Sequence, residues 1–232
     1  MTPHSLGRRR RDGRWLLVAP VVLTLALAAC SGGGDDPPEP VPTTTTTTSA
    51  PRPTAQAAGP EQSPDQVAAA VGSLSIGDLL RTEPLDGVPP QVVVCPGGPV
   101  LSADEGATVA TTHFGSPSEA VAVVTLVYPD AAAATAAVEP TLAAVDDCTA
   151  TGQIDGVPLE PVTHGRTEVD GTATGFVVVQ GDDPVAPYQH RSVAQVGNVV
   201  LGVVTSGRSP EQVERQAAAS LPDVLTAITP AS

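Results

Sequence analysis

The chain has 232 residues, with 11 Lys and Arg against 25 Asp and Glu, so its formal net charge is −14. All 11 cationic residues are arginines, which excludes lysine-dependent chemistry such as a Schiff base or a phosphate-loop lysine. The acidic balance also argues against a nucleic-acid partner, because such proteins present a basic face.

The first 29 residues have the pattern of a bacterial export signal. Arginines at 8–11 and 14 precede an apolar run, 15–29. The run is too short to span a bilayer, since a spanning helix needs about 20 apolar residues. It ends in Leu27-Ala28-Ala29-Cys30, which resembles the lipobox of bacterial lipoproteins of the actinobacterial type. The resemblance implies cleavage before Cys30 and acylation of its thiol with palmitate-type chains. The alternative is a plain secretory signal followed by an unrelated cysteine.

Removal of residues 1–29 takes away five arginines and Asp12, which leaves 6 Arg against 24 acids and a net charge of −18. Such a chain is repelled by anionic headgroups, so the expected contact with membrane lipid runs through the acyl chains, two or more of which give stable anchoring. We therefore expect a lipid-anchored protein on the extracytoplasmic side of the cell membrane.

Residues 30–63 are a low-complexity segment of Gly, Pro and Thr with a run of six threonines at 43–48. The segment has almost nothing to bury, so we expect a disordered tether. Its Thr/Pro composition is compatible with O-glycosylation and equally with an unmodified spacer.

From residue 64 to 232 the apolar pattern predicts one domain. A helix is expected at 63–71, with Ser63 as its cap and Pro64 in its first turn, and a helical turn at 76–81. A strand is expected at 91–95, and a hairpin from the β-branched runs 107–114 and 120–128.

The second half of this domain predicts two longer helices around three strands. The first helix covers 130–145, with a kink or break near Pro140, and the second covers 209–228. Strands are expected at 171–180, 188–196 and 199–205, the last two joined by a turn at Gly197-Asn198. The short links between strands predict an α+β fold, a twisted antiparallel sheet with the two main helices packed on one face.

Three cysteines are present, and lipidation of Cys30 leaves Cys95 and Cys148. Outside the membrane thiols tend to be oxidised, so we expect a disulfide between them, which would stabilise the domain by roughly 4 kcal/mol. A metal site or a reactive thiol is the alternative, although the pair has no CxxC spacing.

Three segments are similar to the extracellular sensor domain of mycobacterial PknH-type kinases, a family that also occurs as stand-alone lipoproteins. They are residues 121–130 with the following Ala-rich helix and Cys148, residues 191–200, and the closing helix at 210–228. The resemblance implies an antiparallel sheet with helices on one side, a cleft, and a sensing role without known catalysis. The chain departs from the family in its single in-domain cysteine pair and in having no kinase domain.

The sequence shows no catalytic motif. His113, His164 and His190 have no metal-ligand spacing, and no serine lies in a GxSxG elbow. We expect no enzyme activity, no metal and no cofactor. The scarce arginines Arg166 and Arg191, with His190 beside the latter, are the candidate ligand-binding residues if a cleft binds an anion. Their alternative role is in ordinary surface ion pairs.

These features predict a cell-envelope lipoprotein whose domain binds or senses a small molecule or another envelope protein. Two alternatives stay open, a carrier of an apolar lipid ligand and a structural surface protein. A buried apolar cavity above roughly 300 Å³ would favour the carrier. A shallow polar cleft with Arg166 or Arg191 at its floor would favour the sensor.

Overall fold

The computed structural model describes residues 60–83, 90–103, 106–116, 119–154 and 156–230. All of them belong to one compact unit, Ser49–Ser232. The expected signal peptide, Cys30 and the tether up to residue 59 lie outside the described residues. Within the described ranges, no helix combines the length and the apolar character needed to cross a membrane.

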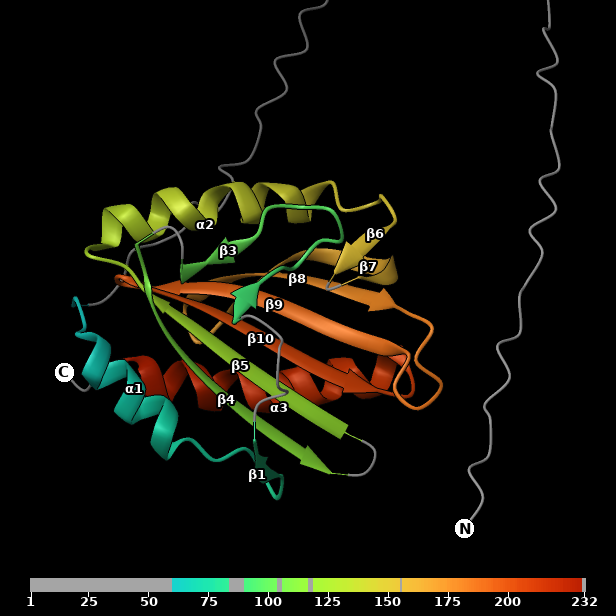
Figure 1. The fold of residues 1–232 in the computed structure, drawn as a ribbon, viewed down its shortest axis with the longest axis horizontal. Helices are drawn as coiled ribbons and strands as arrows, with labels where there is room; N and C mark the ends of the chain where they lie inside the picture. The colour runs from blue at the N-terminus through green and yellow to red at the C-terminus, as the bar shows by residue number, and fades with distance from the viewer. Residues whose placement is uncertain (1–59, 84–89, 104–105, 117–118, 155, 231–232) are drawn as a thin grey trace, which may run out of the picture. The chain divides into compact units, whose positions relative to one another are not determined.

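One strongly curled sheet dominates the described part of the chain (Figure 1). Its eight described strands are antiparallel and lie in the order β1-β4-β5-β10-β9-β8-β7-β6. The predicted hairpins are confirmed, because β4 pairs with β5, and β9 pairs with β10 around a turn at Gly197-Asn198. The bounds are β1 Leu80–Thr82, β4 Thr108–Ser116, β5 Glu119–Val127, β6 Gly152–Ile154, β7 Val157–Val169, β8 Thr172–Gln180, β9 Tyr188–Val196 and β10 Val199–Gly207.

Three helices accompany the sheet in the described ranges: α1 Pro64–Ser73, α2 Ala131–Asp146 and α3 Pro210–Ile228. The residue before each helix caps it, because its side-chain oxygen accepts a hydrogen bond from a backbone N–H of the first turn. The capping residues are Ser63, Asp130 and Ser209. The helix α2 continues through Pro140, so the alternative of a break near Glu139 is wrong, and the kink stays a prediction. Val138 and Leu142, on either side of this exposed proline, are buried in the core and hold the helix together.

The α+β class and the antiparallel sheet are confirmed, but the two long helices do not share a face. Along β10, Val200 belongs to the core cluster beneath α2, whereas Leu201 and Val203 belong to the cluster beneath α3. Successive strand side chains point to opposite faces, so α2 and α3 cover opposite faces of the sheet. Figure 1 shows α2 along one side of the sheet and α1 with α3 along the other.

Some strands differ from their prediction. Residues 76–79 form a turn with Gly77 at φ +47°, and β1 follows it and pairs with β4, so the predicted helical turn at 76–81 is wrong. The strand predicted at 91–95 is reduced to β2, Gln91–Val92, which pairs with β3, Leu101–Ser102. Neither β3, β6 nor the 13-residue β7 was predicted.

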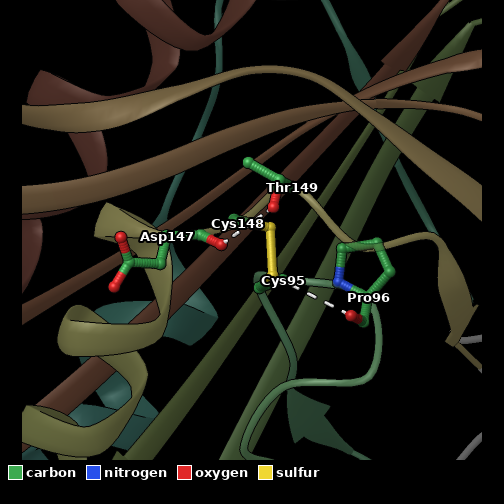
Figure 2. Close-up of a disulfide and its surroundings, with 5 residues drawn as sticks. All are labelled: Cys95, Pro96, Asp147, Cys148 and Thr149. Atoms are coloured by element: carbon green, nitrogen blue, oxygen red, sulfur yellow. Dashed lines mark hydrogen bonds between the residues drawn. A yellow bond between two sulfur atoms is a disulfide. The ribbon is translucent and has the colours of Figure 1, made fainter. Parts of the chain in front are cut away.

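The predicted disulfide between Cys95 and Cys148 is confirmed, with an S–S distance of 2.09 Å and a Cα–Cα distance of 5.7 Å. Figure 2 shows that it ties the segment after β2 to the end of α2. Both cysteines belong to the core cluster beneath α2. The bridge therefore holds the short β2–β3 ribbon over that face of the sheet.

The domain begins slightly before residue 64. Gln62 donates its backbone N–H to Asn198 Oδ1 at 2.7 Å and its side-chain amide to the Ile228 carbonyl at 2.6 Å. Asn198 Nδ2 in turn donates to the Gln62 carbonyl at 3.0 Å. The chain thus enters the domain at the end of the sheet that carries the β9–β10 turn, next to the end of α3.

Candidate functional site

Arg166 on β7 is engaged with α2. Its Nε and Nη2 donate to the two carboxylate oxygens of Asp146, both at 2.9 Å, and Nη2 also donates to the Leu142 carbonyl at 2.8 Å. The guanidinium therefore sits at the C-terminus of α2, where the helix dipole favours a cation. Arg166 joins β7 to α2 and contributes to the fold of this face.

Arg191 on β9 reaches over the same face of the sheet. Its Nη1 donates to the Val93 carbonyl at 2.8 Å, and its Nε donates to Gln189 Oε1 at 2.9 Å. The first contact holds the segment after β2 against the sheet, close in sequence to the disulfide-bonded Cys95. Arg191 therefore also has a structural contact.

His190 precedes Arg191 in β9, so its side chain points to the opposite face, beneath α3. Only 8% of it is exposed. One ring nitrogen, Nδ1, lies 3.1 Å from Ser192 Oγ, and the ring stacks on Phe176 with the centroids 5.3 Å apart. Burial lowers the pKa of His190 to about 4, partly offset by a hydrogen bond to its own backbone. The imidazole is therefore neutral at physiological pH.

A pocket of about 400 Å³ lies between α3 and the strands β7, β8 and β9, with His190 and Ser192 in its lining. Most of the exposed surface inside it is apolar. The remaining lining residues are Thr167, Val169, Thr174, Phe176, Glu214, Ala217, Ala218, Leu221 and Pro222.

The three predicted binding residues are therefore not brought together. His190 lines this pocket, whereas Arg166 and Arg191 lie on the other face of the sheet and do not line it. The three residues do not share one cleft, because the strand alternation separates residues 190 and 191, and an anion site at Arg166 or Arg191 on their own face stays a prediction. The pocket also lies under α3, not beside the Ala-rich α2.

Sequence reasoning missed Ser192, Phe176 and Glu214. Ser192 is two residues from His190 on the same strand, so period-two alternation could have paired them. Phe176 and Glu214 are brought there by the β8–β9 register, in which Phe176 lies opposite Ser192, and by the packing of α3. No local pattern in the sequence encodes those contacts.

The Ser192–His190 contact has the length of a nucleophile–base pair. Ser192 lies in a strand flanked on both sides, opposite Phe176 of β8 and Val203 of β10. Its backbone therefore belongs to the sheet ladders. Within the described residues, no group of three or more His, Cys, Asp or Glu side chains could hold a metal.

The sequence matches no protein-family model and no curated protein at a significant level. Among solved structures, the chain is similar to the extracellular domain of PknH from Mycobacterium tuberculosis, with a TM-score of 0.43 and 15% identity over 72% of this chain and 93% of that one. It is also similar to the X-ray structure of an Rv0999 ortholog from Mycobacterium smegmatis, with a TM-score of 0.31 and 12% identity over 76% of this chain and 98% of that one. The first of these is the kind of extracellular domain that the sequence resembles.

Proposed function

We propose that this protein is a membrane-anchored, extracytoplasmic, sensor-like domain that binds a small molecule in the pocket between α3 and the strands β7, β8 and β9, without catalysis. The observation that carries the proposal is the pocket itself, in which a buried polar pair, His190 and Ser192, lies within a largely apolar lining. Ligand sites typically combine an apolar wall with a few convergent polar groups.

The extracytoplasmic location is supported by the disulfide between Cys95 and Cys148. Structural disulfides persist in oxidising compartments and are rare in the cytosol. The export signal and the lipobox-like motif ending in Cys30 support attachment through acyl chains.

The carrier of an apolar ligand is the second candidate, and the apolar lining favours it. The volume of about 400 Å³ is at the low end of the range for ligand pockets, so the cargo would have to be compact. A sensor and a carrier use the same pocket and differ in the consequence of binding, which is a signal for the sensor and delivery of the cargo for the carrier.

Native mass spectrometry of the protein purified from its own envelope tests ligand binding. We expect a bound mass on the wild type that is lost in Ala218→Trp, since the indole would fill the pocket from its exposed side. Ala219→Trp is the matched control: Ala219 is the next residue of α3, is also exposed, and does not line this pocket. Binding unaffected by Ala218→Trp would mean that the ligand is held outside this pocket, and no bound mass at all would leave the structural surface protein as the better account.

Fractionation of cells producing Cys30→Ser tests the anchoring separately. The variant is expected to leave the membrane fraction, because a serine hydroxyl cannot take the place of the acylated thiol. Full retention in the membrane would contradict acylation of Cys30.

A further inference from the structure

The rim of the pocket carries one kind of charge. Of its lining residues, Glu214 is the one with a charged side chain at neutral pH, and it is exposed on α3. The deeper polar groups, His190 and Ser192, are uncharged hydrogen-bonding groups. An anionic ligand would therefore meet a carboxylate at the entrance and no cation inside.

The net charge of the chain and the positions of its arginines also disfavour an anionic ligand. Without residues 1–29 the chain has 6 Arg against 24 acids, a net charge of −18, so its field attracts cations and repels anions. The arginines of the pocket strands, Arg166 in β7 and Arg191 in β9, are hydrogen-bonded on the opposite face of the sheet.

The residues that line the pocket favour a ligand with a flat, apolar part. Phe176 presents an aromatic ring, and Leu221 and Pro222 of α3 line the same space. A molecule of one or two rings fits a volume of about 400 Å³. A hydroxyl group is both a donor and an acceptor, so Ser192 can form one further hydrogen bond to a polar group of such a ligand besides its contact with His190.

From these contacts we propose that the pocket selects a compact organic cation, with its flat apolar part against Phe176 and its ammonium group at the rim beside Glu214. This inference rests on the proposed function, since it names the ligand class of the same pocket. It predicts that ligands of similar shape but different charge bind to the pocket with different affinities.

Three probes that share a phenylethyl body test it: phenethylamine, 2-phenylethanol and 3-phenylpropanoate, titrated calorimetrically into the purified protein. Because exposed ion pairs are worth about 0.2–1 kcal/mol, the amine should bind about 1.4- to fivefold more tightly than the alcohol. The propanoate should bind most weakly. Glu214→Gln should remove the advantage of the amine and leave the affinity for the alcohol unchanged.

Glu168→Gln is the matched control, because Glu168 is exposed on β7 next to Thr167 but points to the other face of the sheet. It removes the same charge near the pocket and should change none of the three affinities. Ala218→Trp should weaken all three. Propanoate binding as tight as that of the amine, an unchanged ratio in Glu214→Gln, or no binding of the amine at millimolar concentration would overturn the charge preference. The bound mass from the envelope tests the proposed function independently of these probes.

Discussion

The Oγ of Ser192 lies 3.1 Å from Nδ1 of His190, and both side chains are buried between the sheet and α3, where they line the pocket. A buried imidazole that hydrogen-bonds a hydroxyl group is kept neutral, because burial penalises its charged form. The lowered pKa of His190 links the pocket to the stability of the domain.

Stability should therefore fall with acidification. The unfolded chain binds a proton at residue 190 near pH 6.5, whereas the folded chain does so only near pH 4. Between these values the unfolded state binds more protons, so the free energy of unfolding decreases as the pH falls, by about 2 kcal/mol from pH 7 to pH 5. Urea denaturation at both pH values measures this difference.

His190→Gln should flatten that pH dependence. A residual slope is expected from His113, whose pKa is also lowered by partial burial. His164→Gln serves as the control, since His164 lies on the opposite face of the sheet. An equal pH dependence in the wild type and His190→Gln would contradict the neutral buried imidazole.

Gly202 in β10 is fixed by close packing against the β2–β3 ribbon. A β-carbon at this position would lie 2.7 Å from Cγ2 and 2.8 Å from Cγ1 of Val92. Gly202→Ala should destabilise the domain by about 1–3 kcal/mol through overpacking, and adding Val92→Ala should recover part of the loss. Gly72→Ala in α1 is the control: a β-carbon there would meet no atom within 4 Å, so replacing this helical glycine should be neutral or stabilising.

The disulfide should carry a large share of the stability of the α2 face. The double substitution of Cys95 and Cys148 by serine opens a loop with a sequence separation of 53 residues. On the chain-entropy model this costs roughly 4 kcal/mol. The midpoint of urea unfolding should drop accordingly, and a reducing agent should shift the wild type to the same midpoint. Coincident midpoints of the wild type under oxidising and reducing conditions would show that the bridge contributes nothing.

Arg166 should affect folding without affecting the ligand. Arg166→Met removes the bidentate contact with Asp146 and the bond to the Leu142 carbonyl, so we expect a loss of about 1–3 kcal/mol. The affinity of the pocket for phenethylamine should stay the same, because Arg166 lies on the other face. A selective loss of binding at unchanged stability would restore Arg166 as a binding residue.

Much of the fold could be predicted because its signals are local. The alternating β-branched runs predicted β4, β5, β9 and β10 within a few residues, and Ser63, Asp130 and Ser209 mark helix starts by side-chain capping. The strand β7 was not predicted, because two prolines and Gly165 interrupt its apolar pattern. Its hairpin with β8 closes at Asp170-Gly171, both at positive φ, which is a turn signal that the sequence did contain.

The site was harder to predict because it depends on which face each residue takes. The prediction grouped His190 with Arg191 as sequence neighbours, but adjacent residues of a strand point to opposite faces. The positions of Glu214 and Phe176 follow from how α3 packs on β8 and β9, a tertiary relationship with no local signal. The periodicity of strands and the caps of helices can be predicted from the sequence, whereas the pocket arises from the packing of α3 on the sheet.

The most direct test of ligand binding is the ring ¹⁵N spectrum of His190 in the protein purified from its own envelope, recorded before and after the bound molecule is extracted with organic solvent. If a molecule occupies the pocket, the His190 ring signals should shift on extraction while those of His164, on the other face, stay in place. The account is contradicted if a bound molecule is extracted and the His190 signals do not change. That result would mean that the molecule was held elsewhere and that the pocket under α3 is not the site.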